Sequence, residues 1–68
     1  MPYQSNFELP LPVRSRLPDE AQDIYRATFN KAFKTYRDDP RHEEIAHRVA
    51  WAAVKRLYVK RGQIWVPR

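Results

Sequence analysis

Two histidines close together in the sequence are the first candidates for metal chemistry. His42 and His47 are five residues apart, a spacing that turns them by about 140° from each other on a helix. Glu43 and His47, four residues apart, do share a helix face, but two ligands are too few for a structural zinc site. We therefore predict no metal site and interpret Glu43 and His47 as a surface pair near the start of a helix.

The residue types needed for catalysis are scarce. The chain has no cysteine and one glycine, so it has neither a thiolate nucleophile nor a glycine-rich phosphate loop. The hydroxyls of Ser15, Thr28 and Thr35 have no histidine nearby in the sequence. Acidic residues do cluster at positions 19, 20 and 23, where the positive end of a helix explains them. A chain of 68 residues rarely builds a water-excluding cleft, so we expect neither an enzyme nor a bound cofactor.

A basic helical face is the strongest candidate for binding. Arg41, Arg48 and Lys55 are spaced by seven residues and follow one face of a helix, with Trp51 close to it. The net charge of +5 is confined to this part of the chain: residues 1–40 hold six basic and six acidic side chains, whereas residues 41–68 hold seven and two. The candidate partner-binding residues are Arg41, Arg48, Trp51, Lys55, Arg56, Lys60 and Arg61.

Two classes of partner fit this basic face. An acidic protein surface would complement its charge. Nucleic acid would pair its phosphates with the basic side chains and stack a base on Trp51, with an affinity that falls as salt rises. The acidic "RDDP" turn at 37–40 would repel phosphate. In a third interpretation the face is only solvated, Trp51 is covered by the rest of the chain, and the protein has no dedicated ligand.

Two long helices are expected to position these residues. Apolar residues recur every three or four positions from 21 to 36, after a proline and an acidic first turn, and predict a helix over residues 18–37. Asp39 before Pro40 predicts the cap of a second helix over residues 40–59, which ends before Gly62. The short connection makes the helices roughly antiparallel neighbours. The predicted apolar stripe of the second helix is Ile45, Ala46, Val49, Ala50, Ala53, Val54 and Leu57, whose alanines allow a bulky first helix to approach closely.

Both ends of the chain are expected to cover the helix pair. Prolines at 10, 12 and 18 predict an extended N-terminal arm with at most a short helical turn at 12–16. "QIWVPR" at 63–68 predicts a short strand, with residues 3–8 as its candidate partner. Either the arm or this last segment would cover Trp51, and we favour the arm. The arm is expected to pack through Phe7, Leu9, Leu11, Val13 and Leu17.

These patterns predict one mainly α domain over residues 1–68. The absence of cysteine excludes disulfides and suits a reducing compartment. The first ten residues lack the basic and apolar regions of a secretory signal, and no window reaches the roughly 20 apolar residues of a membrane span. We therefore expect a cytoplasmic protein.

Three stretches of the chain resemble the ChaB family of small bacterial proteins. They are "MPY" at the start, "LPDEAQDIYRATFNKAF" at 17–33 and "EEIAHRVAWAAVKRLY" at 43–58. The resemblance implies a small helical fold with little strand, and a regulator of cation transport associated with a sodium or calcium/proton antiporter, without catalytic residues. The residues of the shared pattern to which we assign structural roles are Leu17, Pro18, Gln22, Tyr25, Phe29, Asn30, His47, Trp51 and Tyr58.

The family pattern also bears on two polar residues. Asn30 lies in an otherwise apolar stretch, so its amide is expected to bond the backbone of the arm, because an unpartnered buried amide is costly. His47 is expected to have a similar structural role or to lie at a partner surface. The leading hypothesis is a non-enzymatic regulatory or adaptor protein that binds an acidic protein surface, such as that of a cation antiporter; the alternative is a nucleic-acid-binding module.

Overall fold

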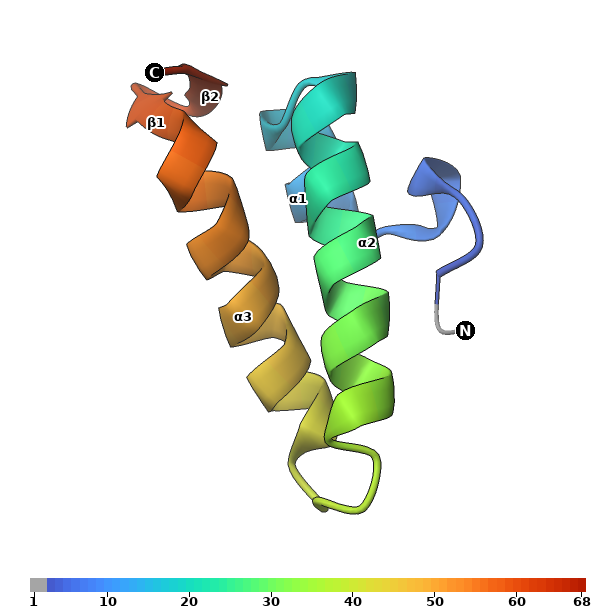
Figure 1. Ribbon diagram of the computed structural model, residues 1–68. Coiled ribbons are helices and arrows are strands. Elements are labelled where there is room, and N and C mark those ends of the chain that lie inside the picture. Colours follow the sequence, from blue (N-terminus) through green and yellow to red (C-terminus); the bar gives the residue numbers. More distant parts are fainter. Residues whose placement is uncertain (1–2) are drawn as a thin grey trace.

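Two long helices side by side dominate the structure (Figure 1). The computed structural model describes residues 3–68, so Met1 and Pro2 of the "MPY" motif lie outside the described residues. The elements, in chain order, are the 3-10 helix η1 (Asn6–Glu8), α1 (Leu11–Arg16), α2 (Asp19–Thr35), α3 (His42–Leu57), β1 (Tyr58–Arg61) and β2 (Ile64–Pro67). The predicted mainly α fold with a short C-terminal strand is confirmed. No helix among residues 3–68 is long and apolar enough to cross a bilayer.

The first long helix, α2, follows the predicted pattern closely. Pro18 is its N-cap, and Asp19 and Glu20 place negative charge in the first turn, where it favours the helix dipole. The helix ends at Thr35, two residues before the predicted end, because Tyr36 leaves the helical region at φ −102° and ψ 23°. The Tyr36 ring is consequently 44% exposed instead of packing in the core.

The second long helix, α3, is shorter than predicted at both ends. The Asp39 carboxylate accepts the backbone N–H of Arg41 at 2.8 Å, and the Asp39 carbonyl accepts the N–H of His42 at 3.0 Å. This local turn delays the start of the helix from Pro40 to His42. At the other end Tyr58 is extended, with φ −130° and ψ 156°, and begins β1. The predicted end at residue 59 was wrong because Tyr58 and Val59 pair with β2 instead.

The core is built from large aromatics on α2 and small residues on α3. Tyr25 and Phe29 have no exposed surface, and neither have Ala46 and Ala50, so the two helices approach closely as predicted. Val54 completes the buried row of α3. The predicted stripe was too wide: its members Val49 and Leu57 are 37% and 58% exposed, since α2 covers only the middle of that face.

The C-terminal strand has a nearer partner than the one predicted. β2 pairs antiparallel with β1, placing Val59 opposite Val66 and Lys60 opposite Trp65. Gly62 allows the tight turn between the strands with a positive φ of 64°. Residues 3–8 do not pair with β2 but contain η1. A hairpin closes a far shorter loop than a pairing between the two ends of the chain, so it loses less entropy.

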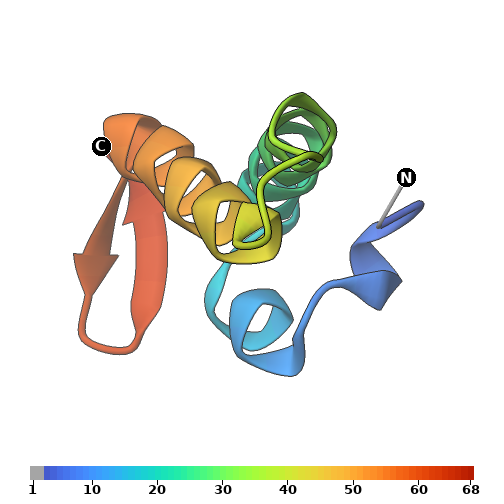
Figure 2. The ribbon, with the colours of Figure 1, turned by 90° about the horizontal axis from the view of Figure 1, so that it is seen from below.

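The N-terminal arm packs through fewer residues than predicted. Leu9, Val13 and Leu17 are buried, whereas Phe7 and Leu11 are 84% and 66% exposed. Val13 faces the core from α1, whereas Leu11, two residues earlier on the same helix, faces solvent; Phe7 lies in η1, which has no buried residue. Figure 2 shows that the arm with α1 and the β1–β2 hairpin both lie on one side of the α2–α3 pair.

Close packing of α2 on Ala50 can be tested by enlarging that residue. Ala50→Leu is expected to lower the free energy of unfolding by about 1–3 kcal/mol, because the added carbons have no space. Ala52→Leu, the same change on an exposed position of α3, should stay within about 0.5 kcal/mol of the wild type. Urea unfolding followed by circular dichroism gives both values; equal losses would contradict the role of Ala50.

Candidate functional site

The basic residues of α3 do not form the single continuous face that the sequence predicts. Glu44 lies between Arg41 and Arg48, with carboxylate oxygens 2.8 Å from the Arg41 guanidinium and 3.7 Å from that of Arg48. All three side chains are well exposed, so these ion pairs contribute little stability. They do offset positive charge at the start of the helix.

The uncompensated charge lies at the other end of α3 and in the hairpin. Lys55, Lys60 and Arg61 are exposed, and within residues 3–68 none of them forms an ion pair. Arg68 joins them because its Nε donates to the carbonyl of Lys55 at 2.9 Å and its backbone N–H to that of Leu57 at 3.0 Å. We call Lys55, Lys60, Arg61 and Arg68 the C-terminal basic cluster.

Trp51 belongs to the packed interior more than to a binding surface. Its ring lies 5.5 Å from Trp65 of β2 and 5.3 Å, edge to face, from Tyr25 of α2. The last segment therefore supplies the contact expected of the arm, because the hairpin folds back onto the same side of α3. These contacts cover part of the Trp51 ring, which is partly buried against the core.

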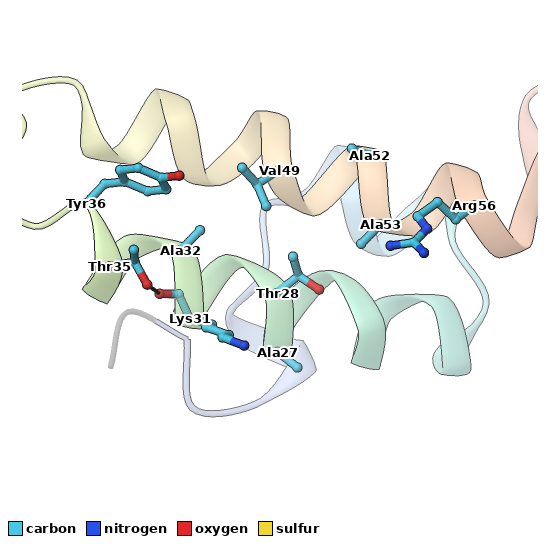
Figure 3. Close-up of a pocket in the computed structure, with 10 residues that line it drawn as sticks. All are labelled: Ala27, Thr28, Lys31, Ala32, Thr35, Tyr36, Val49, Ala52, Ala53 and Arg56. Carbon is cyan, nitrogen blue, oxygen red and sulfur yellow. Dashed lines mark hydrogen bonds between the residues drawn. The ribbon is translucent and has the colours of Figure 1, made fainter.

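Arg56 points away from the C-terminal basic cluster, into a groove on the opposite side of the helix pair. The groove has a volume of about 570 Å³. Figure 3 shows Val49 and Ala53 of α3 above Ala32 and Thr28 of α2, with Arg56 at one end and Tyr36 at the other. We call this feature the α2–α3 groove. It is lined by Ala27, Thr28, Lys31, Ala32, Thr35, Tyr36, Val49, Ala52, Ala53 and Arg56.

The sequence reasoning missed the α2–α3 groove, although a signal for it is present. Residues 28, 31, 32 and 35 form an i, i+3, i+4, i+7 row on α2, and residues 49, 52, 53 and 56 form the same row on α3. Each row lies beside the buried row of its own helix. The rows form one feature only when the two helices are packed together, so neither row was singled out.

Two buried amide side chains hold the N-terminal arm on α2. Asn30 accepts the backbone N–H of Tyr3 at 3.2 Å and donates to the carbonyl of Tyr3 at 2.7 Å. This is the bond to the arm that the cost of a buried amide led us to expect. Gln22 donates to the carbonyls of Arg14 and Leu17 at 3.2 and 2.9 Å, and so holds the end of α1 as well.

His47 pairs with a tyrosine instead of Glu43. The Tyr25 hydroxyl forms a hydrogen bond with Nδ1 of His47, whose ring also lies 4.7 Å from that of Phe29. The expected surface pair of Glu43 and His47 was wrong, because the imidazole of His47 is hydrogen-bonded to Tyr25 of α2 instead. His42 packs against Phe33 at 4.3 Å, and among residues 3–68 no three histidine or acidic side chains gather to hold an ion.

Burial raises the pKa of the Tyr25 phenol well above its usual value of 10.0, and the nearby phenol of Tyr3 adds to the effect. The phenol therefore keeps its proton at physiological pH and stays hydrogen-bonded to His47 as a neutral group. The pair is a structural contact between α2 and α3.

The fold and its surface define a class of protein: a small helical protein with a C-terminal hairpin and a basic surface where the second long helix ends. The family model ChaB matches residues 9–68. The chain is 50% identical over 66 residues to the "Putative cation transport regulator ChaB" of Escherichia coli strain K12, with 88% of this chain and 87% of that protein covered. The protein of the same name from Shigella flexneri matches equally well.

A solution structure agrees with this relationship. The NMR structure of a "putative cation transport regulator ChaB" matches with a TM-score of 0.88 at 44% identity, covering 98% of this chain and 99% of the other. The chain belongs to the ChaB family. The resemblance seen in the sequence is confirmed, and so is the fold that it implies.

The raised pKa of Tyr25 predicts a pH dependence of stability. Because the folded-state pKa is raised, the contribution of Tyr25 is fully present below about pH 10 and is lost as the pH rises from there toward the folded value. The free energy of unfolding should fall above pH 10. A single group with a raised pKa contributes a slope of up to about 1.4 kcal/mol per pH unit to this fall. Tyr25→Phe should remove this part of the slope.

The measurement is urea unfolding at several pH values between about 9 and 12, comparing slopes and not absolute stabilities. Tyr36→Phe, which changes an exposed tyrosine, serves as the matched control and should keep the wild-type slope. Identical slopes for the wild type and Tyr25→Phe would show that the buried phenol does not control the alkaline transition.

Proposed function

We propose that this chain is a non-enzymatic regulator of cation transport that acts from the cytoplasmic side by binding an acidic protein surface through the C-terminal basic cluster. The single observation that carries the proposal is the position of Lys55, Lys60 and Arg61, which are exposed and free of ion pairs within residues 3–68. Family membership supplies the class of activity, since the relatives are named for the regulation of cation transport.

The distribution of charge supports a specific orientation of binding. The arginines at the start of α3 share Glu44, and the connection before α3 carries Asp38 and Asp39. The hairpin end carries the excess positive charge. An acidic partner would therefore be attracted to the hairpin end, with association that weakens as salt rises.

Competition for carboxylates offers a mechanism by which such binding would respond to cations. Carboxylate oxygens are the usual ligands of Ca²⁺ in proteins. If the partner's acidic groups also attract the transported cation, that cation and the C-terminal basic cluster compete for them. Regulator binding would then be strongest when the cation is scarce, and it would weaken as the cation concentration increases.

The proposal can be tested by neutralising the C-terminal basic cluster. Lys55→Gln, Lys60→Gln and Arg61→Gln together remove three exposed charges and should weaken binding about tenfold, because each exposed pair contributes up to about 1 kcal/mol. The assay is sodium- or calcium-driven proton exchange in everted membrane vesicles from a host strain that lacks the gene. Purified protein is titrated in, and the concentration for half-maximal effect is measured.

The matched control removes the same charge elsewhere. Arg16→Gln, Lys34→Gln and Arg37→Gln change three exposed basic residues outside the cluster and should leave the half-maximal concentration within about twofold of the wild type. The proposal fails if the wild-type protein alters neither exchange activity, or if both triple variants lose the effect equally.

The same variants separate a nucleic-acid partner from a protein partner. Fluorescence anisotropy of a short DNA duplex is measured at low and moderate salt with each protein. Salt-dependent binding that the cluster variant loses, together with no effect on vesicle transport, would assign the cluster to phosphate contacts. Transport effects without duplex binding would support the regulator.

A further inference from the structure

One side of the α2–α3 pair is covered and the other is not. The N-terminal arm, α1 and the hairpin all lie on the same side, as Figure 2 shows. The bonds from Gln22 and Asn30 to the arm, and the Trp51–Trp65 contact to the hairpin, keep them there. The α2–α3 groove lies on the other side, which no element of residues 3–68 covers.

The floor of the α2–α3 groove is made of small and apolar side chains. Thr28 and Ala32 of α2 face Val49 and Ala53 of α3, and Ala52 forms the exposed edge (Figure 3). Val49 is 37% exposed there although it is a β-branched apolar residue. Small residues allow another backbone to approach at the 8–10 Å typical of packed helices.

The charges around the α2–α3 groove have one sign. Lys31 and Arg56 are both exposed, and the groove is lined by no carboxylate. Within residues 3–68 neither of these two cations forms an ion pair. Thr35 does not supply a free donor, because its hydroxyl donates to the carbonyl of Lys31 at 2.9 Å.

We propose that the α2–α3 groove seats an amphipathic acidic helix of the protein partner. The partner helix would place small apolar residues against the floor and carboxylates beside Lys31 and Arg56, completing a bundle of three helices. This inference rests on the proposed function only in taking the partner to be a protein. It specifies that the partner presents a helix with acidic flanks. It also places a second contact site on this chain, away from the C-terminal basic cluster.

Other occupants fit the α2–α3 groove less well. A second copy of this chain in a symmetric pair would bring its own Lys31 and Arg56 to the same place, where like charges repel. Nucleic acid would gain only two cationic contacts and would place phosphates over the alanine and valine side chains of the floor. Charge complementarity therefore favours the acidic helix.

The test uses two synthetic helical peptides of about four turns. Both carry alanine and leucine on one face, flanked by glutamate in the first peptide and by lysine in the second. Each is titrated into the ¹⁵N-labelled chain and followed by amide NMR. The acidic peptide is expected to shift the amides of Ala27, Thr28, Ala52 and Ala53, and the basic peptide is not.

Exposed basic residues inside and outside the groove supply a matched pair of variants. The double variant K31E/R56E reverses the two charges of the groove and should weaken binding of the acidic peptide at least about tenfold. The double variant K34E/R37E makes the same change in net charge at two exposed residues outside both the groove and the C-terminal basic cluster, and it should alter the affinity less than about twofold. The basic peptide should bind K31E/R56E better than the wild type.

Four results would overturn the inference. The first is the absence of shifts with the acidic peptide at millimolar concentration, and the second is equal binding of both peptides. The third is a set of groove shifts that depends on the concentration of the chain alone, which would assign the surface to a second copy. Shifts confined to the hairpin would also reject the groove, while leaving the role of the C-terminal basic cluster to be decided by vesicle transport.

Discussion

The contact on which the rest of the structure depends is that of two aromatic rings with two alanines. Tyr25 and Phe29 of α2 have no exposed surface, and each ring of this type removes roughly 150–250 Å² from water. Ala46 and Ala50 leave room for them on α3. With a connection of six residues, Tyr36 to Arg41, between the helices, this contact sets both the antiparallel arrangement and the close approach.

Close helix packing has a consequence for the two surfaces of the pair. A pair of helices has two sides, and the arm, α1 and the hairpin all lie on the same one (Figure 2). Hydrogen bonds from Gln22 and Asn30 hold the N-terminal arm on one side of the pair. The contact between the Trp51 and Trp65 rings holds the C-terminal hairpin on the same side. The opposite side exposes the α2–α3 groove, and the end of α3 exposes the C-terminal basic cluster. The two surfaces proposed for binding are thus separate from the contacts that hold the ends of the chain on the helix pair.

The core and helix assignments were largely predictable, and the errors have local causes. The periodic apolar residues of α2 and the alanines of α3 predicted the helix pair, and the partner of Asn30 followed from the cost of burying an amide. The predicted strand partner was wrong because β2 pairs with the adjacent β1 in a hairpin, which competes with pairing between the chain ends. The residue pattern of one strand does not indicate which other strand it pairs with. Phe7 and Leu11 were placed in the core because the arm was expected to be mostly extended, whereas Phe7 lies in η1, which buries no residue, and Leu11 lies on the exposed side of α1.

The sequence by itself determined the family, the two helices and the excess of basic charge in residues 41–68. These properties follow from the spacing of apolar residues, the positions of prolines and the counts of charged residues. None of these depends on which residues are neighbours in three dimensions. Only the tertiary structure decided that Trp51 lies against Trp65 and that Lys31 and Arg56 flank one groove. Each of these depends on side chains brought together from different elements. The packing of α2 on α3 and the folding of the hairpin onto α3 fix the positions of those side chains.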